Sequence, residues 1–230
     1  MNLNKNIIDY LKIAVLIFIA IFLVVINHNL LVYGRRITIT STDSRPSHKV
    51  NLLKGKGIIV GDVNAKLTIT VFVDYECVFC KQFMDEVYPS IQEDYISTGK
   101  LNIEFRNLPL SMHLNSFFAA KSMVCANKFG HFFDLHSIIL NKQTSISESM
   151  ILTEVAALKI DTAKFLSCIS DSTIISQVNA DILECKRNDI RSTPTFVING
   201  NVYVGLFGYN NFKEIIEKEI NAETPQNTCH

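Results

Sequence analysis

The sequence predicts an α/β fold, in which a strand–helix–strand unit precedes a long helical stretch and a closing strand pair. An apolar, β-branched run at residues 67–73 leads into helical spacing that begins at Cys77, and an alternating run follows at residues 101–105. Residues 112–190 carry no strand signal. Near the N-terminus, residues 13–26 form an unbroken apolar run that predicts a membrane segment ahead of the fold.

Length, charge and cysteine content narrow the class of protein. The chain has 230 residues, of which 48% are hydrophobic, and its 22 basic side chains equal its 22 acidic ones. This composition excludes a disordered chain, a collagen-like repeat and a polytopic membrane protein. Zero net charge argues against nucleic-acid binding, because nothing would neutralise a row of phosphates. Because the chain has six cysteines, its chemistry depends on whether its compartment is oxidising or reducing.

The N-terminal apolar run has two lysines before it and two arginines shortly after it. Its 14 residues are few for a spanning helix and typical of a signal-peptide core, whereas the wider stretch 7–33 is long enough to cross a bilayer. We therefore expect residues 1–34 to be a signal anchor, with a cleaved signal peptide as the alternative and a buried core helix as a third interpretation. The first two would export everything that follows.

The next elements follow in order along the exported part. Residues 35–56 are polar and predict a tether with little structure, and residues 57–61 predict a short strand. The helix from Cys77 to about residue 95 contains Pro89, which should kink it. A strand–helix–strand unit pairs its two strands in parallel. We therefore expect residues 57–111 to form the first part of one domain.

The helical stretch and the closing elements complete the chain. Residues 112–190 predict an inserted all-helical domain, and residues 191–222 predict the second part of the first domain. Asn199-Gly200 predicts a hairpin turn between two short strands, and an amphipathic helix follows. The last residues, 223–230, read as a loose polar tail. The five expected helices span about 115–129, 131–141, 148–159, 162–169 and 172–188.

The chemistry-bearing motif is Cys77-Val78-Phe79-Cys80, at the passage from strand to helix. Unpaired N–H groups and the positive dipole end at a helix N-terminus stabilise a thiolate at Cys77, which makes it the attacking sulfur. Cys80 lies one turn later and can resolve a mixed disulfide formed at Cys77. Such a pair passes two electrons without a cofactor. Half a zinc site or a structural disulfide are the alternatives, but no second CxxC or CxxH provides further zinc ligands.

A second element is Ser192-Thr193-Pro194, just before a late strand. An X-Pro bond there predicts a turn, and a cis bond is available to it. An ordinary loop proline is the alternative interpretation.

Taken in order, these motifs resemble the thioredoxin superfamily, specifically the DsbA-like exported thiol–disulfide oxidoreductases with an inserted helical domain. The resemblance covers about residues 57–222. It rests on Gly61-Asp62 with Asn64-Ala65, Val73-Asp74-Tyr75-Glu76-Cys77-Val78-Phe79-Cys80, Phe105-Arg106-Asn107-Leu108-Pro109-Leu110 with His113, Ala119-Ala120, Thr193-Pro194-Thr195-Phe196-Val197-Ile198-Asn199-Gly200 and Gly205. It implies a thioredoxin fold and a cis-proline loop, formed by Thr193 and Pro194, that packs against the CxxC. The backbone before that proline would pair with an extended substrate.

The chain departs from the family pattern around the cysteines. Well-studied members carry a proline and a histidine between them, whereas Val78 and Phe79 supply no charge. We therefore expect the Cys77 thiolate to depend mainly on the helix terminus. Some relatives carry a buried acid six residues earlier, where this chain has Val71. Asp74 and Glu76 are candidates for proton transfer with Cys80, against the plainer interpretation of turn or surface residues.

The remaining cysteines and histidines have weaker assignments. Similar proteins often carry cysteines at the positions of Cys125 and Cys168, which implies a structural disulfide in an oxidising compartment, with two buried free thiols as the alternative. A bridge between Cys185 and Cys229 is a further hypothesis. We expect packing or surface roles for His131 and His136, which are five residues apart, and a local structural role or a place near the site for His113.

The sequence therefore predicts a disulfide-forming oxidoreductase in the bacterial cell envelope, on the periplasmic side of the inner membrane, anchored or released. Its partners would be unfolded or folding exported proteins with free cysteines, and the resemblance implies a quinone-linked membrane reoxidase. We expect a monomer without metal, cofactor or nucleic acid. A disulfide isomerase or reductase of the same fold is the alternative within this chemistry. A holdase-type binding module, whose CxxC is only a structural disulfide, is the alternative from another class.

Overall fold

The computed structural model describes residue 10 and residues 12–24, 45–53 and 56–222. The chain divides into two compact units, Met1–Thr40 and Ser41–His230. In the first unit, residues 12–24 are helical. Within the described ranges we find no helix with the length and apolar character needed to cross a bilayer. The predicted membrane segment lies partly outside those ranges and stays a prediction.

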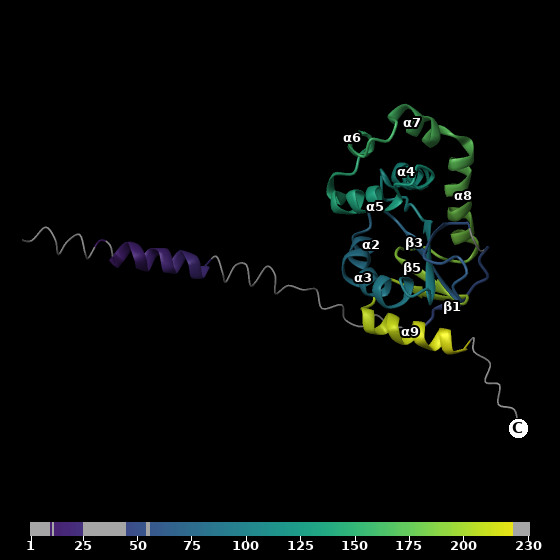
Figure 1. Cartoon of the computed structure of the whole chain (residues 1–230), viewed down its shortest axis with the longest axis horizontal. Helices are drawn as coiled ribbons and strands as arrows, with labels where there is room; N and C mark the ends of the chain where they lie inside the picture. The colour runs from purple at the N-terminus through teal and green to yellow at the C-terminus, as the bar shows by residue number, and fades with distance from the viewer. Residues whose placement is uncertain (1–9, 11, 25–44, 54–55, 223–230) are drawn as a thin grey trace, which may run out of the picture. The chain divides into compact units, whose positions relative to one another are not determined.

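A six-stranded sheet forms the centre of the second unit, in the order β1-β6-β5-β3-β4-β2 (Figure 1). Strands β3 and β4 pair in parallel, as the strand–helix–strand pattern predicts, and every other neighbouring pair is antiparallel. Both central strands are buried along nearly their whole length. The apolar, β-branched side chains of β3 fit a sheet that is covered on both faces, whereas β4 alternates apolar residues with buried polar ones. The strands are β1 (His48–Lys49), β2 (Ile58–Val60), β3 (Leu67–Val73), β4 (Leu101–Asn107), β5 (Thr195–Ile198) and β6 (Asn201–Val204).

The helical run between β3 and β4 is divided into four pieces rather than kinked once. They are α2 (Val78–Gln82), the π-helical η1 (Phe83–Val87), α3 (Tyr88–Ile91) and the π-helical η2 (Gln92–Ile96). Pro89 lies in the first turn of α3. Because proline has no N–H to donate and its ring crowds the preceding turn, the hydrogen-bond register widens to the π pattern just before it.

Aromatic side chains hold this helical run and the last helix, α9 (Tyr209–Ala222), against one face of the sheet. The ring centroid of Phe196 on β5 lies 4.8 Å from that of Phe83 and 4.7 Å from that of Phe212. All three side chains are fully buried. On the opposite face, Phe72 and Val197 pack in one buried cluster with residues of the helical insertion. Because successive side chains of a strand point to opposite faces, the sheet has one hydrophobic core on each face.

Five helices follow β4, close to the predicted positions. They are α4 (Ser116–Lys128), α5 (Phe132–Asn141), α6 (Glu148–Ala157), α7 (Thr162–Ser170) and α8 (Ser172–Arg187), with a 3-10 turn η3 (Gln143–Ser145) after α5. Figure 1 shows α4 to α7 gathered beyond one end of the sheet and α8 running alongside it. Ser147, Asp161 and Asp171 cap α6, α7 and α8 by accepting backbone N–H groups of the first turn.

The predicted tether is wrong in part, because residues 48–49 form strand β1 on the edge of the sheet. The N–H of Ser47 donates to the carbonyl of Val202, and the N–H of Val50 donates to that of Gly200. An unpaired sheet edge offers donors and acceptors to any extended segment nearby, which explains why a polar stretch without strand signals pairs here. The Asn199-Gly200 hairpin forms as predicted, with positive φ at both residues.

His136, on α5, is buried among aromatic rings and should make the stability of the protein pH-dependent. Burial lowers the pKa of His136 from 6.5 to about 4. Between those values the unfolded chain binds a proton that the folded chain does not, so the free energy of unfolding should fall on acidification. The loss should reach about 3 kcal/mol at pH 4.

Urea unfolding at pH 7, 6, 5 and 4 measures this loss. The variant His136→Phe keeps an aromatic ring but cannot take up the proton, so its stability should vary less across the window by that amount. Parallel pH profiles for parent and variant would contradict the assignment to His136.

Candidate active site

The passage from β3 to α2 positions the first cysteine of the CxxC motif. Cys77 is the N-cap residue of α2 and its side chain makes no capping bond, which leaves its sulfur available. The Cys77 N–H donates to the Asp74 carbonyl at 3.1 Å, and the Cys77 carbonyl accepts from the N–H of Cys80 at 3.1 Å. Both cysteines are free thiols, and Cys77 is 8% exposed against 2% for Cys80. The outer sulfur is therefore the one that a partner protein can reach.

The cis-proline loop lies against this sulfur. The Thr193-Pro194 peptide bond is cis, and Cys77 Sγ donates to the Thr193 carbonyl oxygen at 3.2 Å. The structure thus brings together two segments that lie 116 residues apart in the chain. The Thr193 hydroxyl is buried without a hydrogen-bond partner, so it is available to donate to Cys77 once that group is a thiolate.

The two thiols have opposite acidities. The pKa of Cys77 is lowered to about 6, chiefly by a hydrogen bond from the Cys80 thiol; burial opposes this, and the Thr193 side chain and the backbone N–H groups of Cys80 and Phe79 add to it. Burial, followed by the Cys77 thiolate, raises the pKa of Cys80 well above its ordinary value. Our expectation that the helix terminus is the main stabiliser is wrong, because the neighbouring thiol contributes more. At neutral pH Cys77 is the nucleophile and Cys80 holds the proton.

Asp74 is a buried turn residue rather than a surface residue. Its side chain is fully buried, and the carboxylate accepts the N–H of Glu76 at 2.8 Å and that of Leu110 at 2.7 Å. The Asp74 N–H also points at Cys80 Sγ, at 3.5 Å. Glu76 is half-buried, and its carboxylate accepts the Asn115 N–H at 2.8 Å. Both acids therefore hold the loop after β4 against the active-site turn.

The helical insertion supplies contacts that sequence reasoning missed. Gln143 Nε2, in η3, donates to the carbonyl of Tyr75 at 2.9 Å and to that of Cys77 at 2.8 Å. The Tyr75 hydroxyl pairs with His136 Nδ1 at 3.3 Å, and burial raises the pKa of Tyr75 far above its ordinary value. No local pattern marks Gln143, because its partners are main-chain carbonyls 66 and 68 residues away.

The other cysteines lie apart from this pair. The structure has a disulfide between Cys125 on α4 and Cys168 on α7, with a sequence separation of 43. It joins two helices of the insertion, where it closes a long loop of the unfolded chain. Cys185, on α8, is a buried free thiol whose pKa is raised by burial. Cys229 and its proposed bridge to Cys185 lie outside the described residues.

Exposed apolar side chains flank the outer cysteine. Val78 and Phe79 are 64% and 51% exposed although they directly follow Cys77. Met112 and Leu114, on the loop that Asp74 and Glu76 hold, are 77% and 93% exposed. Such side chains suit contact with an unfolded chain, which presents its own apolar residues.

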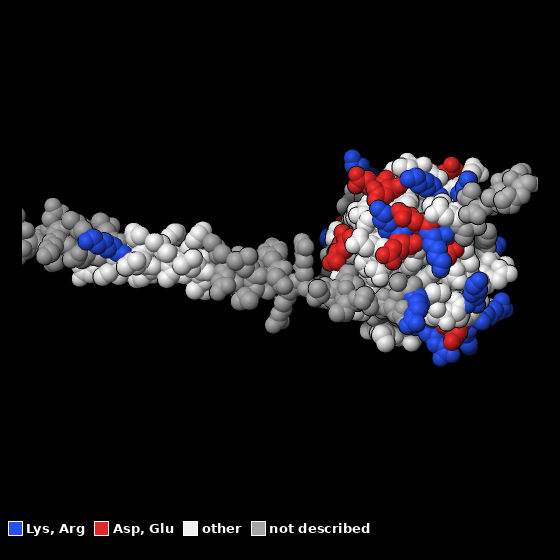
Figure 2. Space-filling model, turned by 90° about the horizontal axis from the view of Figure 1, so that it is seen from below, with Lys and Arg blue, Asp and Glu red and all other residues white. Residues whose placement is uncertain are grey.

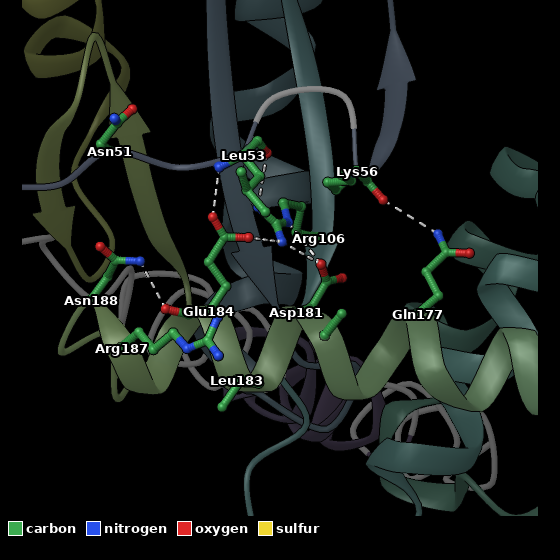
Figure 3. A pocket seen from close by; sticks show the side chains of 11 residues that line it. Asn51, Leu53, Lys56, Arg106, Gln177, Asp181, Leu183, Glu184, Arg187 and Asn188 are labelled. Atoms are coloured by element: carbon green, nitrogen blue, oxygen red, sulfur yellow. Dashed lines mark hydrogen bonds and ion pairs between the residues drawn. The ribbon is translucent and has the colours of Figure 1, made fainter.

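A pocket lies elsewhere, between α8 and the chain around Leu53 (Figure 3). Its volume is about 550 Å³, and neither cysteine of the motif nor the cis-proline loop lines it. At its wall, the guanidinium group of Arg106 pairs with Asp181 and Glu184. Disulfide exchange with a protein partner needs an accessible sulfur and a neighbouring backbone edge, so it does not depend on an enclosed pocket.

Comparison with known proteins agrees with this geometry. Residues 53–218 match a family model described as thioredoxin. Disulfide bond formation protein D of Bacillus subtilis is 28% identical over 178 residues, which cover 74% of this chain and 80% of that protein. The crystal structure of oxidised BdbD from Bacillus subtilis superimposes with a TM-score of 0.66 at 26% identity, covering 78% of this chain and 100% of the other.

A further solved structure extends the comparison. The α-DsbA1 protein of Wolbachia pipientis has a TM-score of 0.65 at 24% identity, over 75% of this chain and 94% of that chain, and shares its fold. The family match spans more than two thirds of the sequence and includes the CxxC and the cis-proline loop. The chain therefore belongs to the thioredoxin family, as a DsbA-like member.

Proposed function

We propose that this protein forms disulfide bonds in exported proteins by dithiol–disulfide exchange at Cys77 and Cys80. The observation that carries the proposal is the contrast within the pair, where a thiol with a pKa lowered to about 6 faces the cis-proline loop and a buried partner keeps its proton. A low pKa at the outer thiol stabilises the reduced form of the enzyme relative to its disulfide form. The oxidised enzyme is therefore a good oxidant. The relative named disulfide bond formation protein D supports the same reaction.

The exchange proceeds in two balanced steps. A substrate thiolate attacks Cys77 Sγ of the oxidised enzyme, the Cys77–Cys80 bond breaks, and Cys80 leaves and takes up a proton. The second substrate thiolate then attacks the substrate sulfur of the mixed disulfide, and Cys77 leaves as a thiolate. The substrate loses two electrons and gains a disulfide, and the enzyme becomes the dithiol. The Thr193 hydroxyl and the Cys80 thiol, both beside Cys77 Sγ, stabilise the departing thiolate.

The edge of the cis-proline loop would hold the substrate. Backbone before Pro194 would pair with an extended segment of the partner chain, and the exposed side chains of Val78 and Phe79 would contact its apolar residues. Acidic and basic side chains are both present on the face shown in Figure 2, in places side by side and otherwise among uncharged residues. The equal numbers of basic and acidic side chains in the whole chain support recognition through backbone and apolar contacts rather than through net charge.

The cellular setting follows from the same proposal. The protein would act in the bacterial envelope, on the periplasmic side of the inner membrane, with residues 1–34 as anchor or signal. A membrane reoxidase, linked to quinone, would accept the two electrons of the dithiol. We also propose the division into thioredoxin parts 57–111 and 191–222 with a helical insertion 112–190, and a monomeric state.

The redox equilibrium of Cys77 and Cys80 with glutathione tests the proposal. The oxidised fraction of the two residues is measured by alkylation and peptide mapping across a series of glutathione ratios. We expect a potential well above the roughly −270 mV of thioredoxin and toward the roughly −120 mV of DsbA. A value at or below that of thioredoxin would favour the reductase. No equilibration at all, with retained suppression of aggregation, would favour the holdase.

A further inference from the structure

The loop after β4 places the imidazole of His113 beside the turn that precedes Cys77. His113 Nδ1 lies 2.8 Å from Asp74 Oδ2, the same oxygen that accepts the Leu110 N–H at 2.7 Å. Two residues further on, the Asn115 N–H reaches the carboxylate of Glu76 at 2.8 Å. The loop is therefore fastened on both sides of His113, and the imidazole has a fixed place beside the residues that precede Cys77.

The turn that precedes Cys77 carries negative charge that opposes ionisation of the Cys77 thiol. Asp74 and Glu76 put two negative charges within three residues of Cys77, and like charges oppose formation of a thiolate. Val78 and Phe79 offer no compensating charge. The Asp74 carboxylate is fully buried, where an uncompensated charge is costly. A cation at His113 offsets part of the negative charge of both carboxylates and leaves the exposed surface between the cysteines free.

The surroundings of His113 favour its protonated form. Its side chain is 22% exposed, and burial by itself would lower its pKa. The hydrogen bond and charge of Asp74, with the charges of Glu76 and Cys77, outweigh burial and raise the pKa of His113.

We propose that His113 is a positioning residue whose positive charge offsets Asp74 and Glu76 and thereby shifts the Cys77–Cys80 pair toward the reduced, thiolate form. This inference rests on the proposed function and concerns the poise of the same site. Reduction adds two electrons and one proton to the disulfide, giving a Cys77 thiolate and a Cys80 thiol. A nearby cation stabilises only the product of that step, so it makes the enzyme a stronger oxidant.

The substitution His113→Asn tests the charge while keeping the contact. The asparagine amide can donate to Asp74 as Nδ1–H does, but it carries no charge. The acid dissociation constant of Cys77, followed by thiolate absorbance, should fall about threefold to tenfold, and the glutathione equilibrium should shift by the same factor toward the disulfide. His113→Lys should restore both, because it returns a positive charge to the loop.

A matched control is available in the helical insertion. His131 Nδ1 pairs with Asp134 Oδ2 at the same 2.8 Å, at the start of α5. The substitution His131→Asn should leave the thiolate titration and the glutathione equilibrium unchanged. If His113→Asn also leaves both unchanged, the proposal is overturned.

The unmodified protein provides an independent reading. Because the coupling between two charges is reciprocal, the pKa of His113 should be higher in the reduced enzyme than in the oxidised enzyme, where Cys77 bears no charge. An NMR titration of the imidazole in both states measures this difference, and equal values would overturn the proposal even if His113→Asn fails to fold. Failure of the function itself would appear separately, as a parent enzyme that does not equilibrate with glutathione.

Discussion

Replacing Cys77 with serine should reduce disulfide exchange to the uncatalysed background. A serine hydroxyl does not form the disulfide that a substrate thiolate attacks, and it is not ionised at neutral pH. The loss should appear both in the oxidation of a reduced, unfolded substrate and in the reduction of insulin. Because serine is close to cysteine in size and its hydroxyl can still donate to the Thr193 carbonyl, the fold should survive the substitution.

Two further variants separate the roles of the thiols. Cys80→Ser keeps the Cys77 thiolate but cannot form the Cys77–Cys80 disulfide. When this thiolate attacks a disulfide of a substrate such as insulin, one substrate thiol leaves and the mixed disulfide should persist, because the Cys80 sulfur that would release it is missing. Cys185→Ala removes a buried free thiol outside the motif and should leave both activities at the parent level. Retention of exchange by Cys77→Ser would refute the assignment of the nucleophile. Unchanged suppression of aggregation would show a separate holdase activity.

Removing the charge of Arg106 should cause a large loss of stability. Arg106 is 1% exposed; its Nε lies 2.8 Å from Asp181 Oδ1 and its terminal nitrogen 2.6 Å from Glu184 Oε2 (Figure 3). Burial by itself would lower the pKa of Arg106, but the two carboxylates outweigh it and raise the pKa. Arg106→Leu leaves these carboxylates buried without their cation, which should cost about 3–5 kcal/mol in the free energy of unfolding.

Urea unfolding measures this cost, and two comparisons make it specific. Arg191→Leu breaks an exposed pair with Asp189 and should cost at most about 1 kcal/mol. A triple variant with leucine at Arg106, Asp181 and Glu184 removes all three charges and should recover much of the loss. A single variant Arg106→Leu within 1 kcal/mol of the parent protein would show that the network contributes little.

The elements that could be predicted from the sequence are those encoded by neighbouring residues. Strand β3 follows from its β-branched run, the β5–β6 hairpin from Asn199-Gly200, and α6 to α8 from their helical spacing. The CxxC is visible for the same reason, because its two sulfurs are three residues apart on one helix. Local propensity and periodicity act within a few residues, so a single sequence reveals them.

Other features depended on which distant segments meet. Asp74 reads as a turn residue, and only the loop from Leu110 to Asn115 makes it a buried carboxylate paired with His113. Strand β1 has no strand signal and forms because β6 leaves an edge unpaired. Gln143 contacts the motif through main-chain carbonyls, which any sequence possesses.

The sequence by itself determined the kind of chemistry, since two cysteines at this spacing between a strand and a helix specify thiol exchange. Only the tertiary structure decided the acidity of each sulfur. Cys77 contacts the carbonyl of Thr193, which lies 116 residues away in the sequence, whereas the Cys80 side chain is almost completely buried. Acidity depends on burial and on nearby charges and donors, which are set by packing and not by neighbours in sequence. The same reasoning applies to His113, whose place beside Asp74 is a property of the folded chain.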